Sequence, residues 1–330
     1  DETHFIHAGK LRRYFGETWL VRVFDFKRNF LNLRDVFLLF LGFIQSFGLL
    51  LKSRPDLVFI KGGYVGVPVG WAARLLRIPY VTHDSDASAG LTNRLIAGGA
   101  KVNAVGMPAE LYSYPKAKTV FVGVPVGDDF SVSSQDHKDH VRAKLSLDRN
   151  SLVILVTGGS NGAQRLDKVV LGVVKDLLES YPNLHIIHQV GQGNENIYKD
   201  YPKELQDRIM VKTFLNPLSD YSTAADLVIA RGGATAIAEF AAQKKTCIIL
   251  PNPQLTGGHQ LENAKVLSQR NAAVVIQEEK ALSDTGYVSN KIKEMLNDQE
   301  KCSELANNLH KFIPNDAAKQ LAELLLKQVK

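Results

Sequence analysis

The stretch LVIARGGATAIAE, residues 227–239, decides the fold, because an apolar strand runs directly into a glycine pair and then into a helix. Gly232 and Gly233 let the backbone come close to a ligand. The helix predicted to begin near Ala234 directs unpaired N–H groups and the positive end of its dipole at that ligand. Glu239 adds a carboxylate one turn into the helix. The pattern predicts a phosphate site beside an acid that can bind hydroxyl groups.

A second unit of this kind begins at residues 152–157, which read as a buried strand, and ends in a helix with apolar residues at helical spacing over residues 166–178. The turn between them consists of Gly158, Gly159, Ser160, Asn161 and Gly162. Neither turn has the spacing of a dinucleotide fingerprint or the Gly-Lys-Ser/Thr of a P-loop. Two such turns could hold a diphosphate from two sides, whereas either turn alone could simply be a packing feature that needs small residues.

The composition fits a soluble globular protein of two domains, with 330 residues, 45% apolar and 22% charged. The net charge of +6 is modest and no long basic run occurs, so no nucleic acid partner is expected. Cys247 and Cys302 lie far apart, which supports neither a disulfide framework nor a metal cluster. We expect a chain of the reducing cytoplasm, with no metal and no cofactor.

The first half alternates predicted strands and helices, as in a parallel sheet covered by helices. Its strands are expected at residues 57–60, 80–83, 102–105 and 119–122. The strands of the second half are expected at residues 152–157, 184–189, 209–212, 227–230, 246–250 and 273–276. Ligands bind at the carboxyl ends of such strands, where Gly62, Gly63, Tyr64 and residues 83–86 fall.

A polar, serine- and aspartate-rich segment at residues 131–148 marks a domain boundary. We therefore predict an amino-terminal domain at 1–146, a carboxyl-terminal domain at 147–313, and a final helix at 314–330 that packs back on the first domain. The chain begins with Asp1 and shows no signal peptide, and residues 3–7 read as a strand with nothing before it. A preceding βα unit is expected to be missing.

Basic and aromatic residues alternate over residues 12–34, and residues 36–51 then carry no charge. That run of sixteen residues is shorter than the ~20 apolar residues of a membrane-spanning helix. We predict that it forms a buried or interfacial helix, burial being favoured. For the basic stretch, contact with an anionic membrane surface and plain solvation of the arginines are equal alternatives.

Several motifs together, in their order and spacing, resemble the bacterial N-acetylglucosamine transferases of glycosyltransferase family 28. The motifs are Gly62-Gly63-Tyr64-Val65, His83 with residues 89–93, residues 122–126, residues 158–163, residues 188–191, residues 230–239, and Gly258-His259-Gln260 with Asn263. These enzymes move GlcNAc from UDP-GlcNAc to lipid I, an undecaprenyl-pyrophosphoryl-muramyl peptide, and so form lipid II for peptidoglycan. The resemblance covers nearly the whole chain.

The resemblance implies an α/β, GT-B fold, in which two Rossmann-like domains with parallel sheets face each other across a cleft. It also implies a peripheral enzyme at the cytoplasmic face of the bacterial plasma membrane, with UDP-GlcNAc and a lipid-linked muramyl-peptide acceptor as partners. The donor-binding residues carried over are Gly158, Gly159, Ser160, Asn161, Gly162, Leu215, Arg231, Gly233, Ala234, Thr235, Glu239, His259 and Gln260. The acceptor-binding residues are Gly62, Gly63, Tyr64, Asp86 and Asn93, with His83 and Asp84 as catalytic candidates.

By this resemblance Leu215 lies against uracil, Glu239 holds ribose hydroxyls and Gln260 holds sugar hydroxyls. A carboxylate accepts two hydroxyl donors, and an amide both donates and accepts. Arg231 either neutralises the diphosphate or pairs with a nearby acid. His83 is equally well explained as a structural histidine.

Three features depart from the family pattern. Asp84-Ser85-Asp86 stands where the family has Glu-Gln-Asn, and Gly127 stands where it has arginine. The family's Gly-Gly-Thr-Gly-Gly-His loop, with the histidine proposed as general base, has no counterpart in this sequence.

The sequence leaves three rival interpretations open. Asp84-Ser85-Asp86 also spells the Asp-x-Asp pattern that holds a divalent metal in another glycosyltransferase architecture. A related GT-B enzyme making a glycolipid would use the same donor turns. A non-catalytic subunit that binds nucleotide sugars would fit the absent base loop.

Overall fold

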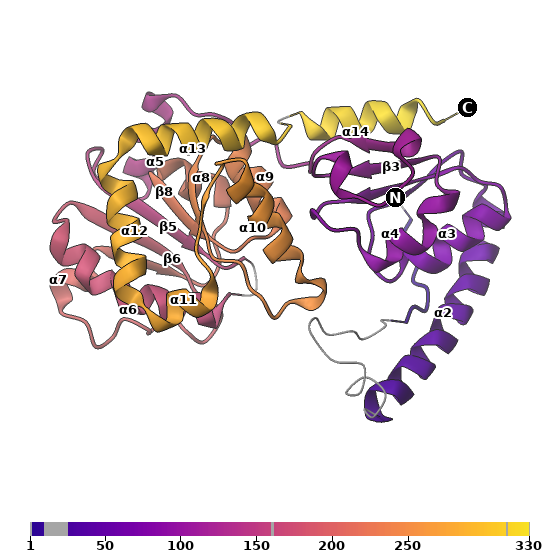
Figure 1. The fold of residues 1–330 in the computed structure, drawn as a ribbon, viewed down its shortest axis with the longest axis horizontal. Coiled ribbons are helices and arrows are strands. Elements are labelled where there is room, and N and C mark those ends of the chain that lie inside the picture. Colours follow the sequence, from indigo (N-terminus) through magenta and orange to yellow (C-terminus); the bar gives the residue numbers. More distant parts are fainter. Residues whose placement is uncertain (1, 10–25, 160–161, 315, 330) are drawn as a thin grey trace. The chain divides into compact units, whose positions relative to one another are not determined.

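The computed structural model describes residues 2–9, 26–159, 162–314 and 316–329. They form two compact units (Figure 1). Unit 1 comprises Asp1–Pro125, Gln254–His259 and Asp316–Lys330, and unit 2 comprises Val126–Pro253 and Gln260–Asn315. The predicted basic-aromatic stretch at residues 12–34 lies largely outside the described residues.

The division after Pro125 comes earlier in the chain than the predicted boundary at residue 146. Helix α5 (Gln135–Lys144) explains the difference, because its Arg142 is buried against unit 2. The Arg142 guanidinium donates to the carbonyl oxygen of Ala224 at 2.9 Å and to Asp226 Oδ2 at 2.8 Å. The polar segment predicted to mark the domain boundary therefore includes a helix that is tied to the second sheet.

Unit 1 contains a four-stranded parallel sheet in the order β1-β2-β3-β4. Its strands are β1 (Val58–Ile60), β2 (Tyr80–Asp84), β3 (Val102–Val105) and β4 (Thr119–Phe121). Its helices are α2 (Phe26–Ser53), α3 (Gly66–Leu75), α4 (Leu91–Ile96) and α14 (Ala317–Leu326), with short 3₁₀ turns η1 (Ala97–Gly99), η2 (Ala109–Leu111), η3 (Lys116–Lys118) and η4 (Thr256–Gly258). Leu321 of α14 packs with Val81, Ala104 and Val122, so the final helix covers this sheet. The prediction of a strand at residues 3–7 is wrong, because residues 2–9 form neither strand nor helix.

The prediction that residues 36–51 form a buried helix is wrong, because α2, which contains them, is largely exposed. Only 11% of its most apolar window is buried, and it is long and apolar enough, by length and composition alone, to cross a membrane. We define the α2 stripe as its exposed apolar residues at three- and four-residue spacing: Phe30, Leu33, Phe37, Phe40 and Ile44, which are 71, 70, 60, 59 and 52% exposed. The opposite side packs on unit 1, where Asp35 and Ser46 are buried and α2 contacts α3.

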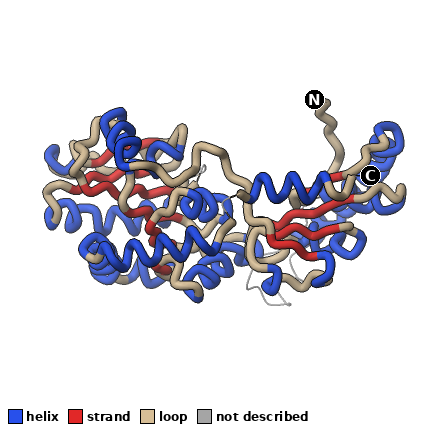
Figure 2. The backbone as a smooth tube through the Cα atoms, turned by 90° about the horizontal axis from the view of Figure 1, so that it is seen from above, coloured by secondary structure: helices blue, strands red, loops and turns tan. Residues whose placement is uncertain are grey.

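Unit 2 contains a six-stranded parallel sheet in the order β10-β9-β8-β5-β6-β7. Figure 2 draws the strands of the chain in red. The strands are β5 (Leu152–Thr157), β6 (Leu184–Gln189), β7 (Ile209–Lys212), β8 (Leu227–Ala230), β9 (Thr246–Ile249) and β10 (Val274–Val275). The helices are α5, α6 (Gln164–Ser180), α7 (Lys203–Gln206), α8 (Leu218–Ala224), α9 (Ala234–Ala242), α10 (His259–Gln269), α11 (Glu278–Ser283), α12 (Thr285–Asn297) and α13 (Gln299–Phe312). The predicted class of two parallel-sheet α/β domains is confirmed.

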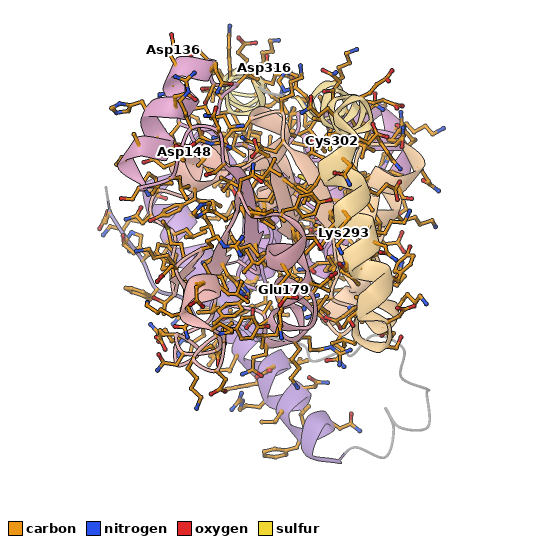
Figure 3. The ribbon with its side chains drawn as sticks, turned by 90° about the vertical axis from the view of Figure 1, so that its left-hand side faces the viewer. Asp136, Asp148, Glu179, Lys293, Cys302 and Asp316 are labelled. Atoms are coloured by element: carbon orange, nitrogen blue, oxygen red, sulfur yellow. The ribbon has the colours of Figure 1, made fainter. Side chains whose placement is uncertain are left out.

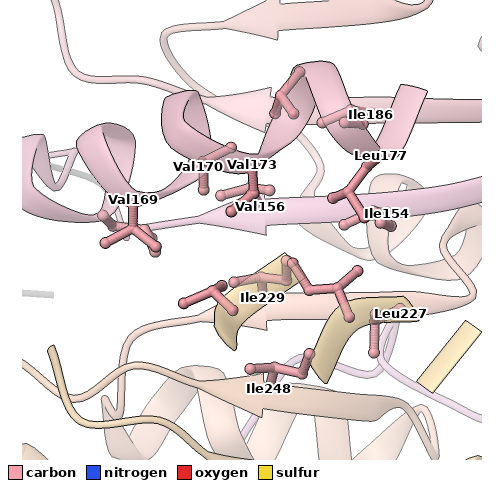
Figure 4. Packing of buried hydrophobic residues seen from close by; sticks show 14 of the residues in the cluster. Ile154, Val156, Val169, Val170, Val173, Leu177, Ile186, Leu227, Ile229 and Ile248 are labelled. Carbon is pink, nitrogen blue, oxygen red and sulfur yellow. The ribbon is translucent and has the colours of Figure 1, made fainter. Parts of the chain in front are cut away.

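The core of unit 2 lies between the sheet and α6 (Figure 4). Val169, Val173 and Leu177 of α6 are buried against Ile154 and Val156 of β5. These helix residues repeat at the four-residue interval that places them on one face. Their burial fixes the start of α6, and with it the end of the glycine turn that precedes the helix.

Candidate active site

The two glycine turns lie side by side in unit 2, because β5 and β8 are neighbouring parallel strands. Thr157 is in register with Ala230, so both strands end at the same edge of the sheet. Gly158–Gly162 follows one strand and Gly232–Gly233 follows the other. Topology therefore joins two motifs that are far apart in sequence. Ser160 and Asn161, predicted to bind the donor, lie outside the described residues.

Both turns lead into helices that have no side-chain cap hydrogen bond from the described residues at their N-cap positions. Ala163 precedes α6 and Gly233 precedes α9, and neither position accepts a capping hydrogen bond from the helix. Ala234 is buried and Thr235 is exposed at the start of α9. Helix amino termini that follow two neighbouring strands provide N–H donors and positive dipole ends for an anion.

Gly162, in the first turn, is constrained in two ways. Its φ is +70°, and a Cβ atom there would lie 2.4 Å from Gly191 Cα. Gly159 also has positive φ, +87°, but a Cβ atom there would meet nothing within 4 Å. Gly162 therefore combines a left-handed backbone with close backbone packing, whereas Gly159 requires only the left-handed backbone.

Substituting Gly162→Ala is expected to weaken UDP binding at least roughly tenfold and to reduce the free energy of unfolding by about 2–5 kcal/mol, because the clash with Gly191 adds to the cost of the left-handed backbone. Gly159→Ala, the matched control, carries only the ~1–2 kcal/mol conformational cost. UDP titration calorimetry and urea unfolding measure both effects. Equal losses in the two variants would contradict the packing argument.

Glu239 is a partly buried carboxylate on α9. Burial, and then the charge of Asp129, raise its pKa to about 7. Its carboxylate has no hydrogen-bond partner among the described residues. A carboxylate that is withdrawn from water without protein donors is suited to accept hydroxyl groups from a ligand.

Arg231 follows β8 but its guanidinium points to protein groups. Its Nη2 lies 2.7 Å from Glu278 Oε1, and its Nη1 donates to the carbonyl oxygen of Leu250 at 2.9 Å. Arg165 Nε also lies 2.6 Å from Glu278 Oε2. The structure thus favours the alternative in which Arg231 pairs with a nearby acid, and the two arginines share one carboxylate that is fully buried.

The second turn is held by the amino-terminal part of α10. Asn263 Nδ2 donates to the carbonyl oxygen of Gly232 at 2.9 Å, and a Cβ atom on Gly232 would lie 2.8 Å from the carbonyl oxygen of Gln260. Gln260 Oε1 accepts a hydrogen bond from Asn252 N at 2.9 Å. The side-chain amide N–H groups of Gln260 remain as donors beside this turn.

A cavity of about 520 Å³ in unit 2 adjoins the first turn. Its lining includes Gly162, Gly191, Gln192, Asn194 and Phe214. Leu215, predicted to contact uracil, is buried, whereas its neighbour Phe214 is 59% exposed. Phe214 was not among the residues predicted from the sequence, although an aromatic residue two positions after a strand at the ligand edge is a signal for base stacking.

The residues predicted for the acceptor and for catalysis meet in another cavity, of about 390 Å³, in unit 1. Its lining includes the predicted residues Gly62, Gly63, Tyr64, His83, Asp84, Asp86 and Asn93. His259, grouped with the donor residues by the sequence, also lines this cavity, and its Nδ1 lies 2.7 Å from Ser88 Oγ. Parallel topology explains the cluster, since β1 and β2 end at one edge of the sheet.

His83 and Asp84 differ in whether a side-chain atom is left without a hydrogen-bond partner among the described residues. Asp84 Oδ2 accepts a hydrogen bond from the Tyr114 hydroxyl at 2.6 Å, and Oδ1 accepts one from Gly90 N at 3.0 Å. His83 Nε2 donates to the carbonyl oxygen of Gly123 at 2.9 Å, which leaves Nδ1 buried and unpartnered within the described chain. Burial lowers the pKa of His83, so the neutral imidazole is favoured. His83 therefore retains a basic nitrogen, whereas Asp84 is engaged in structure.

Asn93 is also buried, and its Nδ2 donates to the carbonyl oxygen of His83 at 2.9 Å. Its role visible here is to fix the end of β2. Over residues 2–9, 26–159, 162–314 and 316–329, no group of three or more His, Cys, Asp or Glu side chains is arranged to hold a metal ion.

Family models match both parts of the chain: the glycosyltransferase family 28 N-terminal domain at residues 2–104 and the family's C-terminal domain at residues 153–321. The chain belongs to glycosyltransferase family 28. Its fold is accordingly GT-B, and it is a hexosyltransferase by family.

Two relatives of this family 28 chain share one functional name. A protein of Carboxydothermus hydrogenoformans is 32% identical over 89% of this chain and 78% of its own length. A protein of Borrelia garinii subsp. bavariensis is 30% identical over 99% of this chain and 82% of its own length. Both are named UDP-N-acetylglucosamine–N-acetylmuramyl-(pentapeptide) pyrophosphoryl-undecaprenol N-acetylglucosamine transferase. The crystal structure of Acinetobacter baumannii MurG matches with a TM-score of 0.72 and 27% identity, over 89% of this chain and 79% of that one.

Proposed function

We propose that this family 28 chain transfers GlcNAc from UDP-GlcNAc to a lipid-linked muramyl-peptide acceptor, forming lipid II in peptidoglycan biosynthesis. The single observation that carries the proposal is the pairing of β5 with β8, which brings two uncapped glycine turns to one edge of the sheet. The shared name of the relatives supports the choice of donor and acceptor.

In this proposal the donor lies at the glycine turns of unit 2. Ser160, Gly158, Gly159 and the N–H groups of Ala234 and Thr235 face the diphosphate, and fixed N–H dipoles stabilise the charge of UDP as it leaves. The ribose hydroxyls donate to the Glu239 carboxylate. The Gln260 amide contacts the sugar, and uracil lies near Leu215 and Phe214.

The acceptor occupies the cavity of unit 1 that contains Gly62, Gly63, Tyr64 and Asp86. Inversion requires a base to take the proton of the attacking hydroxyl. Within the described chain His83 is the better-placed candidate, because its Nδ1 keeps a lone pair. The Asp-x-Asp interpretation is disfavoured by the hydrogen bonds of Asp84 to Tyr114 and Gly90, which occupy the carboxylate.

A transfer assay tests this function directly. Purified full chain is incubated with radiolabelled UDP-GlcNAc and undecaprenyl-pyrophosphoryl-MurNAc-pentapeptide, and the lipid product is separated. We expect GlcNAc transfer that persists in EDTA. Transfer from UDP-galactose to diacylglycerol instead would support the glycolipid alternative, and UDP-GlcNAc binding without any product would support the non-catalytic one. Loss of transfer in EDTA would support the metal-dependent interpretation.

We also propose that the enzyme is peripheral at the cytoplasmic face of the plasma membrane and docks on it through the α2 stripe. The stripe exposes Phe30, Leu33, Phe37, Phe40 and Ile44, a contiguous apolar surface that water disfavours. The other side of α2 is packed on unit 1. A helix with one packed and one exposed apolar face is suited to lie in the interface of the bilayer that holds a lipid-linked acceptor.

A further inference from the structure

A third cavity, of about 330 Å³, opens in unit 2 at the sheet edge opposite the glycine turns. Leu152, Leu227 and Thr246 in its lining are the first residues of β5, β8 and β9. The glycine turns follow the carboxyl ends of β5 and β8, so this cavity lies at the amino ends of the same strands. Helix α13, on which Cys302 is labelled in Figure 3, forms another wall.

The lining is strongly positive. Lys138, Lys244 and Lys245 line the cavity, and Asp226 is its only lining acid among the described residues. The Asp226 carboxylate is already engaged: its Oδ1 accepts from Lys138 Nζ at 2.6 Å, and its Oδ2 accepts from Arg142 Nη2 at 2.8 Å. Within the described chain neither Lys244 nor Lys245 forms a salt bridge with a carboxylate.

Hydrogen-bond donors in the lining are also unused. The Lys244 amine, the Gln299 amide and the Ser303 hydroxyl make no side-chain hydrogen bond to the described residues, although all three line the cavity. Lys245 Nζ donates to the carbonyl oxygens of Thr223 and Ala225, both at 3.0 Å. A protonated lysine has three N–H donors, so one remains available.

We propose that this cavity is a binding site for a small oxyanion of charge about −2, such as inorganic phosphate or the phosphate group of a metabolite, held by Lys244, Lys245 and Ser303. Unpaired cations and free donors around one cavity fit tetrahedral oxyanions, whose oxygens accept several hydrogen bonds at once. The volume exceeds what phosphate alone needs, and apolar lining by Met295 and Leu296 leaves space for the carbon part of a phosphate ester.

The charge state of Lys245 adds a pH signature. Burial, and then Lys138, lower its pKa to about 7, with Arg142 acting in the same direction and Asp226 and Cys247 opposing. An anion favours the ammonium form, so it binds most tightly below pH 7 and binding takes up a proton. Affinity falls as pH rises through about 7.

Sulfate is the probe for this test, because its charge stays constant over this pH range. Calorimetric titration with sulfate at pH 6 and pH 8.5, against chloride at matched ionic strength, measures the affinity of the full chain. We expect the double variant Lys244→Met with Lys245→Met to lose at least about tenfold in affinity, and Lys203→Met, an exposed lysine elsewhere in unit 2, to lose nothing. Gly162→Ala, which alters the donor turn, should retain sulfate binding at the cavity.

Single variants keep the result interpretable if the double variant does not fold. Lys245→Met should remove the pH dependence of the affinity for sulfate. Lys244→Met and Ser303→Ala should weaken sulfate binding but leave its pH dependence unchanged. Titration with phosphate and with phenyl phosphate distinguishes the free ion from an ester. Sulfate binding no tighter than chloride, or loss in Gly162→Ala but not in the lysine variants, would overturn the proposal.

Discussion

Glu239→Ala is expected to raise the KM for UDP-GlcNAc by roughly 10- to 150-fold, with no loss in the free energy of unfolding above about pH 7. A hydrogen bond to a charged group contributes about 1.5–3 kcal/mol, and the net loss of one such bond to the ribose accounts for this range. The unliganded protein loses little, because the carboxylate has no partner among the described residues. Transfer kinetics and UDP calorimetry measure the effect.

Deoxy analogues of the nucleotide make this prediction specific. If Glu239 binds the ribose hydroxyls, 2′,3′-dideoxy-UDP should bind the unmodified protein about as weakly as UDP binds Glu239→Ala. The variant should show no further loss with the analogue, because the interaction is already gone. Glu262→Ala removes an exposed acid on α10 and is the matched control, with unchanged kinetics expected. Full additivity of the variant and the analogue would contradict the assignment.

The pKa of Glu239 predicts a pH dependence of donor binding. Burial, with Asp129, raises this pKa to about 7, so the carboxyl is protonated in the free protein below pH 7. The ionised form accepts both hydroxyls, and the affinity for UDP-GlcNAc should rise as pH increases through about 7. Because this pKa is raised on folding, the protonated Glu239 carboxyl stabilises the folded protein at low pH. That contribution to the free energy of unfolding is lost as pH rises through about 7. Both slopes should vanish in Glu239→Gln.

Much of the site was predictable because its chemistry is local. A strand, a glycine pair and a helix are contiguous in residues 227–239, and the backbone rules that govern them act over a few residues. The contact between the two turns was not predictable in this way. It depends on β5 pairing with β8 across the chain, a long-range arrangement set by packing of the whole sheet.

Other features depended on partners distant in sequence. The sequence left open whether Arg231 meets a phosphate or an acid, and only the fold brings Glu278 next to it. The exposure of α2 was predicted wrongly, because an uncharged run has the same composition whether protein or lipid covers it. The folded chain distinguishes the two, since it supplies α3 for one side of the helix and nothing from the described residues for the α2 stripe.

Phe37→Glu combined with Phe40→Glu is expected to abolish binding to anionic vesicles and to reduce transfer to bilayer-embedded acceptor by roughly two orders of magnitude. The two rings are 60 and 59% exposed, so burying them in the bilayer contributes about 2–4 kcal/mol, and the carboxylates add repulsion from anionic lipid. Folding should be preserved, because neither ring belongs to the core. Vesicle co-sedimentation and transfer assays measure the two effects.

A soluble acceptor separates docking from chemistry in this experiment. With a short-chain, water-soluble analogue of the acceptor, the double variant should work as well as the unmodified protein, because the α2 stripe does not line the cavity proposed for the acceptor. Leu326→Glu changes a residue that is 72% exposed on α14 of the same unit and controls for added charge on an apolar surface site. If vesicle binding survives in the double variant, or if both acceptors are lost together, α2 does not hold the enzyme at the membrane and its exposed face requires another partner.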